Sequence, residues 1–295
     1  MIEDGPLADL LVVGGLTIDS FADGTSAPGG AVLHAGRAAA AAGLRTTVVT
    51  VAGPEPVAAL GLAELGAFAD LHVTDAPTTI RYRHRETDGA RRLWLEADTT
   101  PIRLPAEPVQ RLPTSAVLFA PVAREIPAPV LQTWSNVRTR GAVLQGWLRH
   151  GVLGEEVAPI APDALTDDVV TTLASLDVLV ASREDLKAAA DTPVVQLKAL
   201  RGRIGRGPLL VVTDGAEGVW IDMGNRPPHR VAAPSRVEGV PTVGAGDAFA
   251  ALFLAHLAGA GPTRPGQRPD TRRGRDAAAT YAMRAVAEML ESRRG

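Results

Sequence analysis

The sequence predicts an α/β fold, in which helices flank a central, mostly parallel sheet and a small antiparallel β flap forms a lid. Short runs of valine and leucine recur along the chain, alanine-rich segments separate them, and one stretch alternates polar and apolar residues. Unbroken apolar strands are typical of a parallel sheet buried on both faces. Strands that alternate with helices then indicate the α/β class, with right-handed crossovers.

The apolar runs are the predicted strands, and the segments between them are the predicted covering helices. We expect strands at 10–15, 46–53, 115–123, 141–147, 176–182 and 208–215. We expect helices at 30–42, 55–66, 127–140, 184–190, 194–204, 246–259 and 275–292.

Residues 77–104 break this rhythm, because they alternate polar and apolar side chains around Asp88-Gly89. That dipeptide is the strongest short signal for a hairpin. We therefore expect a half-exposed flap inserted into a single domain over 1–295, with a contribution from about 16–28. The arginines of the flap are either an ordinary solvated face or part of a lid. Residues 258–276, rich in proline, glycine and arginine, predict an exposed loop.

Composition excludes several classes of function. The 295 residues are 46% hydrophobic, carry a formal net charge of −3 and include no cysteine. A chain without a basic excess is not drawn to nucleic acid or to membranes, and disulfides, thiolate metal sites and cysteine nucleophiles are excluded. The acidic start of the chain predicts a first strand rather than a signal peptide, and no apolar run approaches the roughly 20 residues of a membrane span. We expect a cytoplasmic protein with small-molecule partners.

Several common catalytic motifs are missing. The chain has no GxxxxGK[ST] loop, no GxSxG elbow, no HExxH helix and no GxGxxG after a strand. P-loop, serine hydrolase and metalloprotease functions therefore lose their usual support.

The stretch GAGD stands directly before an apolar run that predicts a helix. Gly244, Ala245 and Gly246 leave their backbone N–H groups bare around the helix N-terminus, which is typical of an anion pocket. Asp247 can then accept the proton of a substrate hydroxyl as a general base. The simpler alternative is a glycine-rich helix cap whose first turn carries an acidic residue.

These residues lie in a longer pattern that resembles a known family. VPTVGAGDAFAALF (240–253) resembles the C-terminal signature of the ribokinase-like, or PfkB, carbohydrate kinases. VVGGLTIDS (12–20) resembles the first strand of that family, PGGAVLHAGRAAAAAGL (28–44) its glycine pair and helix, and LLVVTDGAEGVWI (209–221) its phosphate-holding strand and turn. The flap falls where the family builds its β lid.

The resemblance implies ATP and Mg²⁺ as cofactors and assigns a role to each matching residue. Asp247 would be the catalytic base, with the N–H groups of residues 244–247 around the transferred phosphoryl group. The acceptor would lie against Asp19, Gly29 and Gly30. The implied nucleotide-binding residues are Ser182, Thr213, Gly215, Gly218, Gly244 and Gly246. The adenine would lie between the 258–276 loop and the last helix.

Two motifs depart from the family pattern. Pro241 stands where the signature commonly has an aspartate. The family's Asn-x-x-Glu motif, which helps to organise magnesium and phosphates, aligns with residues 182–185. Ser182 and Asp185 keep the polarity and one carboxylate but have a shorter reach, so Asp185 is the candidate metal ligand. Glu184 is an alternative ligand, or a simple charge at a helix N-terminus.

The substrate side resembles one branch of the family. Segments 78–92, 120–127 and 144–149 are similar to a branch that includes archaeal myo-inositol kinases. Gln145 follows a strand, at the sheet edge where α/β folds bind ligands. It can hydrogen-bond a polyol, or it is a packing or capping glutamine. Arg124 and Glu125 either face the nucleotide or pair with each other on the surface.

The sequence thus predicts an ATP-dependent kinase that phosphorylates a hydroxyl of a small sugar or cyclitol such as myo-inositol. A nucleoside kinase is one alternative, with Tyr82 and Trp94 as the available stacking residues. A sugar- or nucleotide-binding protein without turnover is a second, and a purely structural scaffold a third. Apolar residues at 93–95 leave open a homodimer through the β flap.

Overall fold

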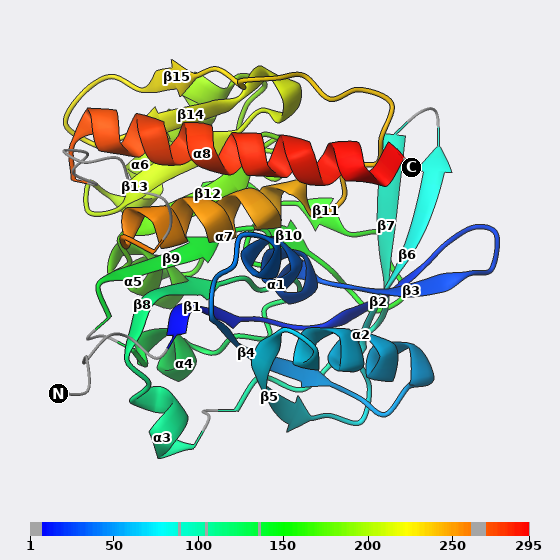
Figure 1. The fold of residues 1–295 in the computed structure, drawn as a ribbon. Helices are drawn as coiled ribbons and strands as arrows, with labels where there is room; N and C mark the ends of the chain where they lie inside the picture. The colour runs from blue at the N-terminus through cyan, green and yellow to red at the C-terminus, as the bar shows by residue number, and fades with distance from the viewer. Residues whose placement is uncertain (1–7, 88–89, 104–105, 135–136, 261–269, 295) are drawn as a thin grey trace, which may run out of the picture.

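A nine-stranded sheet forms the centre of the molecule (Figure 1). The computed structural model describes residues 8–87, 90–103, 106–134, 137–260 and 270–294. The strand order is β15-β14-β13-β12-β9-β8-β1-β4-β5, and β14 alone runs antiparallel to its neighbours. The strands are β1 (Ala8–Val13), β4 (Thr46–Ala52), β5 (Ala69–Asp75), β8 (Thr114–Phe119), β9 (Thr139–Val143), β12 (Val178–Ser182), β13 (Leu209–Thr213), β14 (Val219–Asp222) and β15 (His229–Val231). The predicted fold class is confirmed.

Helices cover both faces of this sheet. One face carries α1 (Ala31–Ala41), α2 (Pro56–Gly66), α7 (Ala245–Leu257) and α8 (Arg272–Glu291). The other carries α3 (Glu107–Gln110), α4 (Ala128–Gln132), α5 (Asp167–Ala174) and α6 (Pro193–Ile204). Alternate residues of β1 serve the two layers, since Leu10 and Val12 pack under the first group and Leu11 and Val13 under the second. In Figure 1, α1, α7 and α8 lie side by side.

Short elements complete the described chain. They are the ribbon of β10 (Arg149–His150) and β11 (Ala158–Pro159), and the 3₁₀ turns η1 (Pro162–Ala164), η2 (Gly215–Glu217) and η3 (Ser292–Arg294). No helix in the described ranges is long and apolar enough to cross a membrane.

The flap is a four-stranded sheet with the order β3-β2-β6-β7. It contains β2 (Thr17–Ser20), β3 (Ser26–Gly29), β6 (Ile80–Thr87) and β7 (Ala90–Ala97). The predicted hairpin pairs β6 with β7 in antiparallel register, and its turn at 88–89 lies outside the described residues. The pair β2–β6, by contrast, is parallel.

The alternation read from the sequence determines the two faces of the flap. Ile80, Tyr82 and His84 are buried toward the body of the molecule. Arg83 and Arg85 lie on the opposite face, over the ring of Trp94. These two arginines therefore lie on the outer face of the flap. This position agrees with the first of the two alternatives, an ordinary solvated face.

The outer edge of the flap is paired within the chain. Leu95 N–H donates to the Glu155 C=O, and Gly154 N–H donates to the Leu95 C=O. Val157 N–H donates to the Leu93 C=O. A homodimer built by adding a strand to β7 would have to displace residues 154–157, and dimerisation through the flap stays a prediction.

Two predicted helices are wrong. Of 127–140 only α4 is helical, because the chain turns after it and enters β9 at Thr139. Residues 184–190 form successive turns rather than a helix. There the Gln196 side chain binds the carbonyl groups of Arg183 and Ala190, which diverts both from a helical ladder. The predictions also missed β5, α5, β14 and β15. Part of the predicted 258–276 loop, residues 261–269, lies outside the described residues.

Candidate active site

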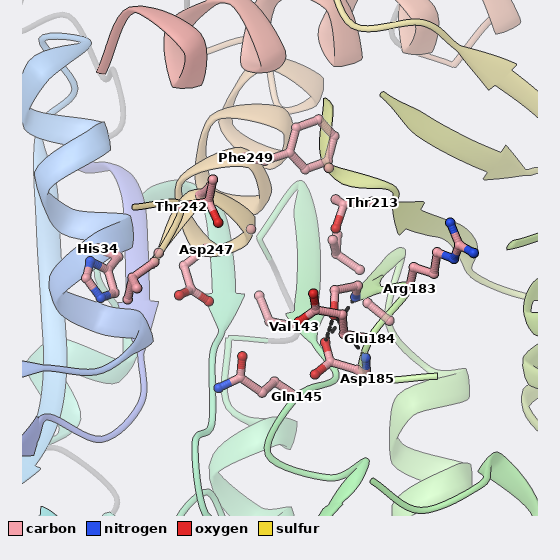
Figure 2. A pocket seen from close by; sticks show the side chains of 18 of the residues that line it. His34, Val143, Gln145, Arg183, Glu184, Asp185, Thr213, Thr242, Asp247 and Phe249 are labelled. Carbon is pink, nitrogen blue, oxygen red and sulfur yellow. Dashed lines mark hydrogen bonds between the residues drawn. The ribbon is translucent and has the colours of Figure 1, made fainter. Parts of the chain in front are cut away.

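The loops at the carboxyl ends of the parallel strands enclose a cavity of about 820 Å³ (Figure 2). Ligands of open α/β sheets bind at this edge. The predicted site residues that line it are Asp19, Gly30, Gln145, Ser182, Asp185, Thr213, Gly215, Gly218, Gly244, Ala245, Gly246 and Asp247. Gly29 lies beside the cavity, where an added Cβ would come within 2.4 Å of Asp19 Oδ2. The structure therefore brings the predicted residues to one place.

The GAGD stretch forms the N-terminus of α7. Gly244 has a left-handed conformation with φ of 77°, and a Cβ there would fall 2.2 Å from Cγ of His34. Ala245 N–H donates to the Thr242 C=O at 3.1 Å. Helix geometry leaves the N–H groups of Gly246 and Asp247 without intrahelical partners. A Cβ at Gly246 would meet no atom within 4 Å, so this end of the helix is open to an anion.

Asp247 projects from the first turn of α7 into the same space as Gln145 (Figure 2). Asp247 is half-buried and lines the cavity. Burial, and then the negative charge of Asp185, raise the pKa of Asp247 to about 7, while Arg149 opposes this shift. A base whose pKa lies near the working pH is suited to proton transfer.

In the turn after β12, the side chains of Ser182 and Asp185 hydrogen-bond to each other. Asp185, only 3% exposed, accepts at Oδ2 from the Ser182 N–H at 3.0 Å and from Ser182 Oγ at 2.7 Å. Its Oδ1 accepts from Arg149 at 3.0 Å. The two residues that replace the Asn-x-x-Glu motif therefore bind each other, and Arg149 supplies the charge that balances the buried carboxylate.

These contacts limit how a magnesium ion fits the site. Both oxygens of Asp185 are engaged, and no cluster of three or more acidic or histidine side chains that could hold a metal occurs among the described residues. Mg²⁺ commonly keeps several waters and binds substrate phosphates. Asp185 would therefore face a phosphate-bound Mg²⁺ ion through water, and the ion would supply positive charge to the phosphates. Direct ligation by Asp185 stays a prediction.

The end of the cavity beside the flap, where the acceptor is predicted to bind, is built around Asp19. Its Oδ1 accepts from Thr17 Oγ1 at 3.1 Å and lies 3.3 Å from His84 Nε2. Gly30 begins α1 with φ of 97°, and a Cβ there would fall 2.6 Å from the Gly15 carbonyl oxygen. The paired glycines thus allow α1 and the Asp19 carboxylate to approach each other closely.

Glu125 fulfils neither of its predicted alternatives. Its side chain is buried and accepts from the N–H groups of Gly15 at 2.6 Å, Val122 at 3.1 Å and Ala123 at 2.8 Å. Burial raises the pKa of Glu125, and these backbone donors oppose the shift. The carboxylate fixes the loops after β1 and β8, while Arg124 is exposed. Nothing in the sequence around Glu125 distinguishes it from a surface residue.

Sequence reasoning missed several residues that line the cavity. His34 packs against Gly244, Arg149 pairs with Asp185, and His84 lies beside Asp19. The alternation of polar and apolar residues along β6, which buries Tyr82, also predicts that His84 faces the same side of the flap. Arg149 gives no such signal, because its role depends on the turn that carries Asp185.

The fold and this site define a class of protein. The central sheet with helices on both faces and the small antiparallel sheet are those of a ribokinase-like fold. The family model described as pfkB family carbohydrate kinase matches residues 150–271, which confirms the predicted resemblance to that family. The matched family is one of phosphotransferases. No curated protein sequence matches the chain.

Solved structures share the fold at low sequence identity. A pyrophosphate-dependent kinase of the ribokinase family, complexed with a pyrophosphate analog and myo-inositol, is 17% identical with a TM-score of 0.73, over 96% of this chain and 95% of that one. Arabidopsis thaliana ribokinase, complexed with ribose and ATP, is 16% identical with a TM-score of 0.69, over 97% and 93%. Vibrio cholerae fructokinase is 20% identical with a TM-score of 0.67, over 98% and 100%.

Proposed function

We propose that the protein is an ATP-dependent kinase that phosphorylates a hydroxyl of an uncharged sugar or cyclitol such as myo-inositol. The observation that carries the proposal is Asp247, whose pKa of about 7 and place in the first turn of α7 put a base beside an anion site. The acceptor carboxylate, Asp19, lines the same cavity.

In this mechanism Asp247 takes the proton of the acceptor hydroxyl as the hydroxyl oxygen attacks the terminal phosphorus of ATP. The bond from that phosphorus to the bridging oxygen breaks, and ADP leaves. The N–H groups of Gly246 and Asp247, with the positive end of the α7 dipole, stabilise charge on the transferred phosphoryl group. Magnesium supplies further charge neutralisation on the phosphates when it is bound. The flap covers the acceptor and keeps water from taking its place.

The acceptor end favours a neutral polyol. Asp19 and Gln145 can hydrogen-bond hydroxyl groups, and the Asp19 carboxylate would repel an anionic acceptor. The nucleoside alternative loses support, because the Tyr82 hydroxyl is committed to the Val122 C=O at 2.7 Å and Trp94 packs under the arginines of the outer face.

The donor end favours a nucleotide over pyrophosphate. Apolar side chains line the cavity beyond the phosphate region, namely Val219, Val237, Met283, Val286, Ala287 and Leu290. An adenine fits such a surface, whereas pyrophosphate would leave it unfilled. Pyrophosphate is the second candidate donor, because similar folds include a pyrophosphate-dependent kinase.

The test is detection of the phosphorylated product by mass spectrometry. The protein is incubated with Mg²⁺ and either ATP or pyrophosphate, across a panel of cyclitols, sugars and nucleosides, with Asp247→Asn as the blank. We expect a phosphorylated cyclitol or sugar with ATP in the wild type alone. A phosphorylated nucleoside, or product from pyrophosphate only, would replace the acceptor or donor assignment. No product in a sample that binds both ligands would favour the binding protein.

A further inference from the structure

The hairpin of the flap contributes side chains to the cavity, and one of them is the imidazole of His84. Of the described residues of β6 and β7, Tyr82, His84 and Leu93 line the cavity. Tyr82 gives its hydroxyl to the Val122 C=O, and Leu93 is apolar. His84 is therefore the hairpin residue that can discriminate between hydroxyl arrangements.

We propose that His84 is a specificity-determining residue, which holds the Asp19 carboxylate and with it recognises neighbouring hydroxyls of the acceptor. This inference rests on the proposed function and adds to it a residue that decides between stereoisomers. The pair combines a carboxylate that accepts hydrogen bonds with an imidazole that can donate or accept them.

Strand register explains how two distant residues meet. The parallel pair β2–β6 places Asp19 opposite Tyr82, and His84 is the next residue of β6 on the same face. His84 Nε2 then lies 3.3 Å from Asp19 Oδ1, with 9% of the His84 side chain and 14% of the Asp19 side chain exposed. Polar groups buried to this extent need partners, which the two residues supply to each other.

Other contacts hold the pair in one geometry. The ring of Phe21 stacks on the His84 imidazole with centroids 5.2 Å apart. Thr17 donates to the same Asp19 oxygen that faces His84, and Gly29 leaves room for the other oxygen. A fixed pair of this kind can reject a wrong hydroxyl arrangement, because the mismatch leaves buried polar groups without partners.

The test compares His84→Leu, His84→Gln and the matched control Arg83→Gln, which alters the adjacent residue on the outer face of the flap. Calorimetry measures the binding of myo-inositol, scyllo-inositol and ribose, and steady-state assays give KM for the donor. Melting temperatures report on the fold.

For His84→Leu we expect acceptor binding to weaken by about 10- to 100-fold, with reduced discrimination between the two inositols. The donor KM should stay near that of the wild type, and the melting temperature should fall by only a few degrees, because Asp19 keeps Thr17 as a donor. His84→Gln should restore part of the affinity, and Arg83→Gln should match the wild type.

Unchanged affinity and unchanged ranking of the inositols in His84→Leu would overturn the inference while leaving the proposed function intact. Equal losses for donor and acceptor with a lowered melting temperature would also overturn it, because that pattern is structural. If the wild type binds no polyol or sugar, the proposed function fails, and the inference fails with it.

Discussion

The two ends of the cavity each contain a buried carboxylate, and the two are held in different ways. Asp19, at the acceptor end, is braced on Oδ1 by Thr17 and His84, with its Oδ2 over the bare backbone of Gly29. Asp185, at the donor end, has both oxygens engaged by Ser182 and Arg149. The first arrangement leaves hydrogen-bonding capacity for a ligand, and the second neutralises a charge within the protein.

This difference shows the effect of the shorter side chains at positions 182 and 185. Ser182 and Asp185 are near enough to bind each other, so the turn stabilises itself instead of reaching toward the donor. The cation of Arg149 then lines the cavity on the side proposed for the donor phosphates. Asp247 lies in the electrostatic field of this pair, since Asp185 raises its pKa and Arg149 lowers it.

The largest effect is expected for Asp247→Asn. Loss of the base should reduce kcat by about 10²- to 10⁴-fold, while nucleotide binding is preserved. Steady-state kinetics and nucleotide titrations measure the two quantities. Turnover close to that of the wild type would remove Asp247 as the base.

The same substitution should stabilise the protein at alkaline pH. The pKa of Asp247 is raised from 3.8 to about 7, so the unfolded state ionises first and stability falls as pH rises between these values. Asn removes that penalty, which is at most about 4 kcal/mol at pH 8 and close to zero at pH 4. Urea unfolding at both pH values measures it, and an equal effect at both would contradict the assigned shift.

Substitutions of the two glycines at the N-terminus of α7 should separate stability from activity. Gly244→Ala puts a Cβ at positive φ and against His34, so we expect a loss of about 1–3 kcal/mol in unfolding free energy. Gly246→Ala lies in open helical backbone and should gain about 0.5–1 kcal/mol, yet lose turnover because its methyl group enters the anion site. Equal losses of stability in both variants would contradict this geometry.

Arg149→Gln should have a smaller but specific effect. It leaves Asp185 buried without its cation, and we expect a loss of about 1–3 kcal/mol in unfolding free energy. The pH profile of activity should also move to higher pH, because one cation that favours ionised Asp247 is gone. Arg183→Gln, whose side chain pairs with Asp214 at an exposed site, is the matched control and should change stability by less than about 1 kcal/mol.

The sequence predicted most of the fold because its signals are local. The apolar runs became β1, β4, β8, β9, β12 and β13, and the alternation around 88–89 became the flap. The helix predicted at 184–190 is absent, and there the Gln196 side chain binds the carbonyl groups of Arg183 and Ala190 at the two ends of the segment. Glu125 and Arg149 act through contacts across the fold, 110 residues from Gly15 and 36 from Asp185 respectively, and local patterns do not report such contacts.

The most direct test of the account is the pH dependence of kcat/KM for the phosphorylated acceptor. If Asp247 is the base, log kcat/KM should rise with unit slope at low pH and reach a plateau above about pH 7. A rate that stays constant between pH 5.5 and 8, in a protein that remains folded over that range, would contradict the assignment of Asp247 as the group that accepts the proton.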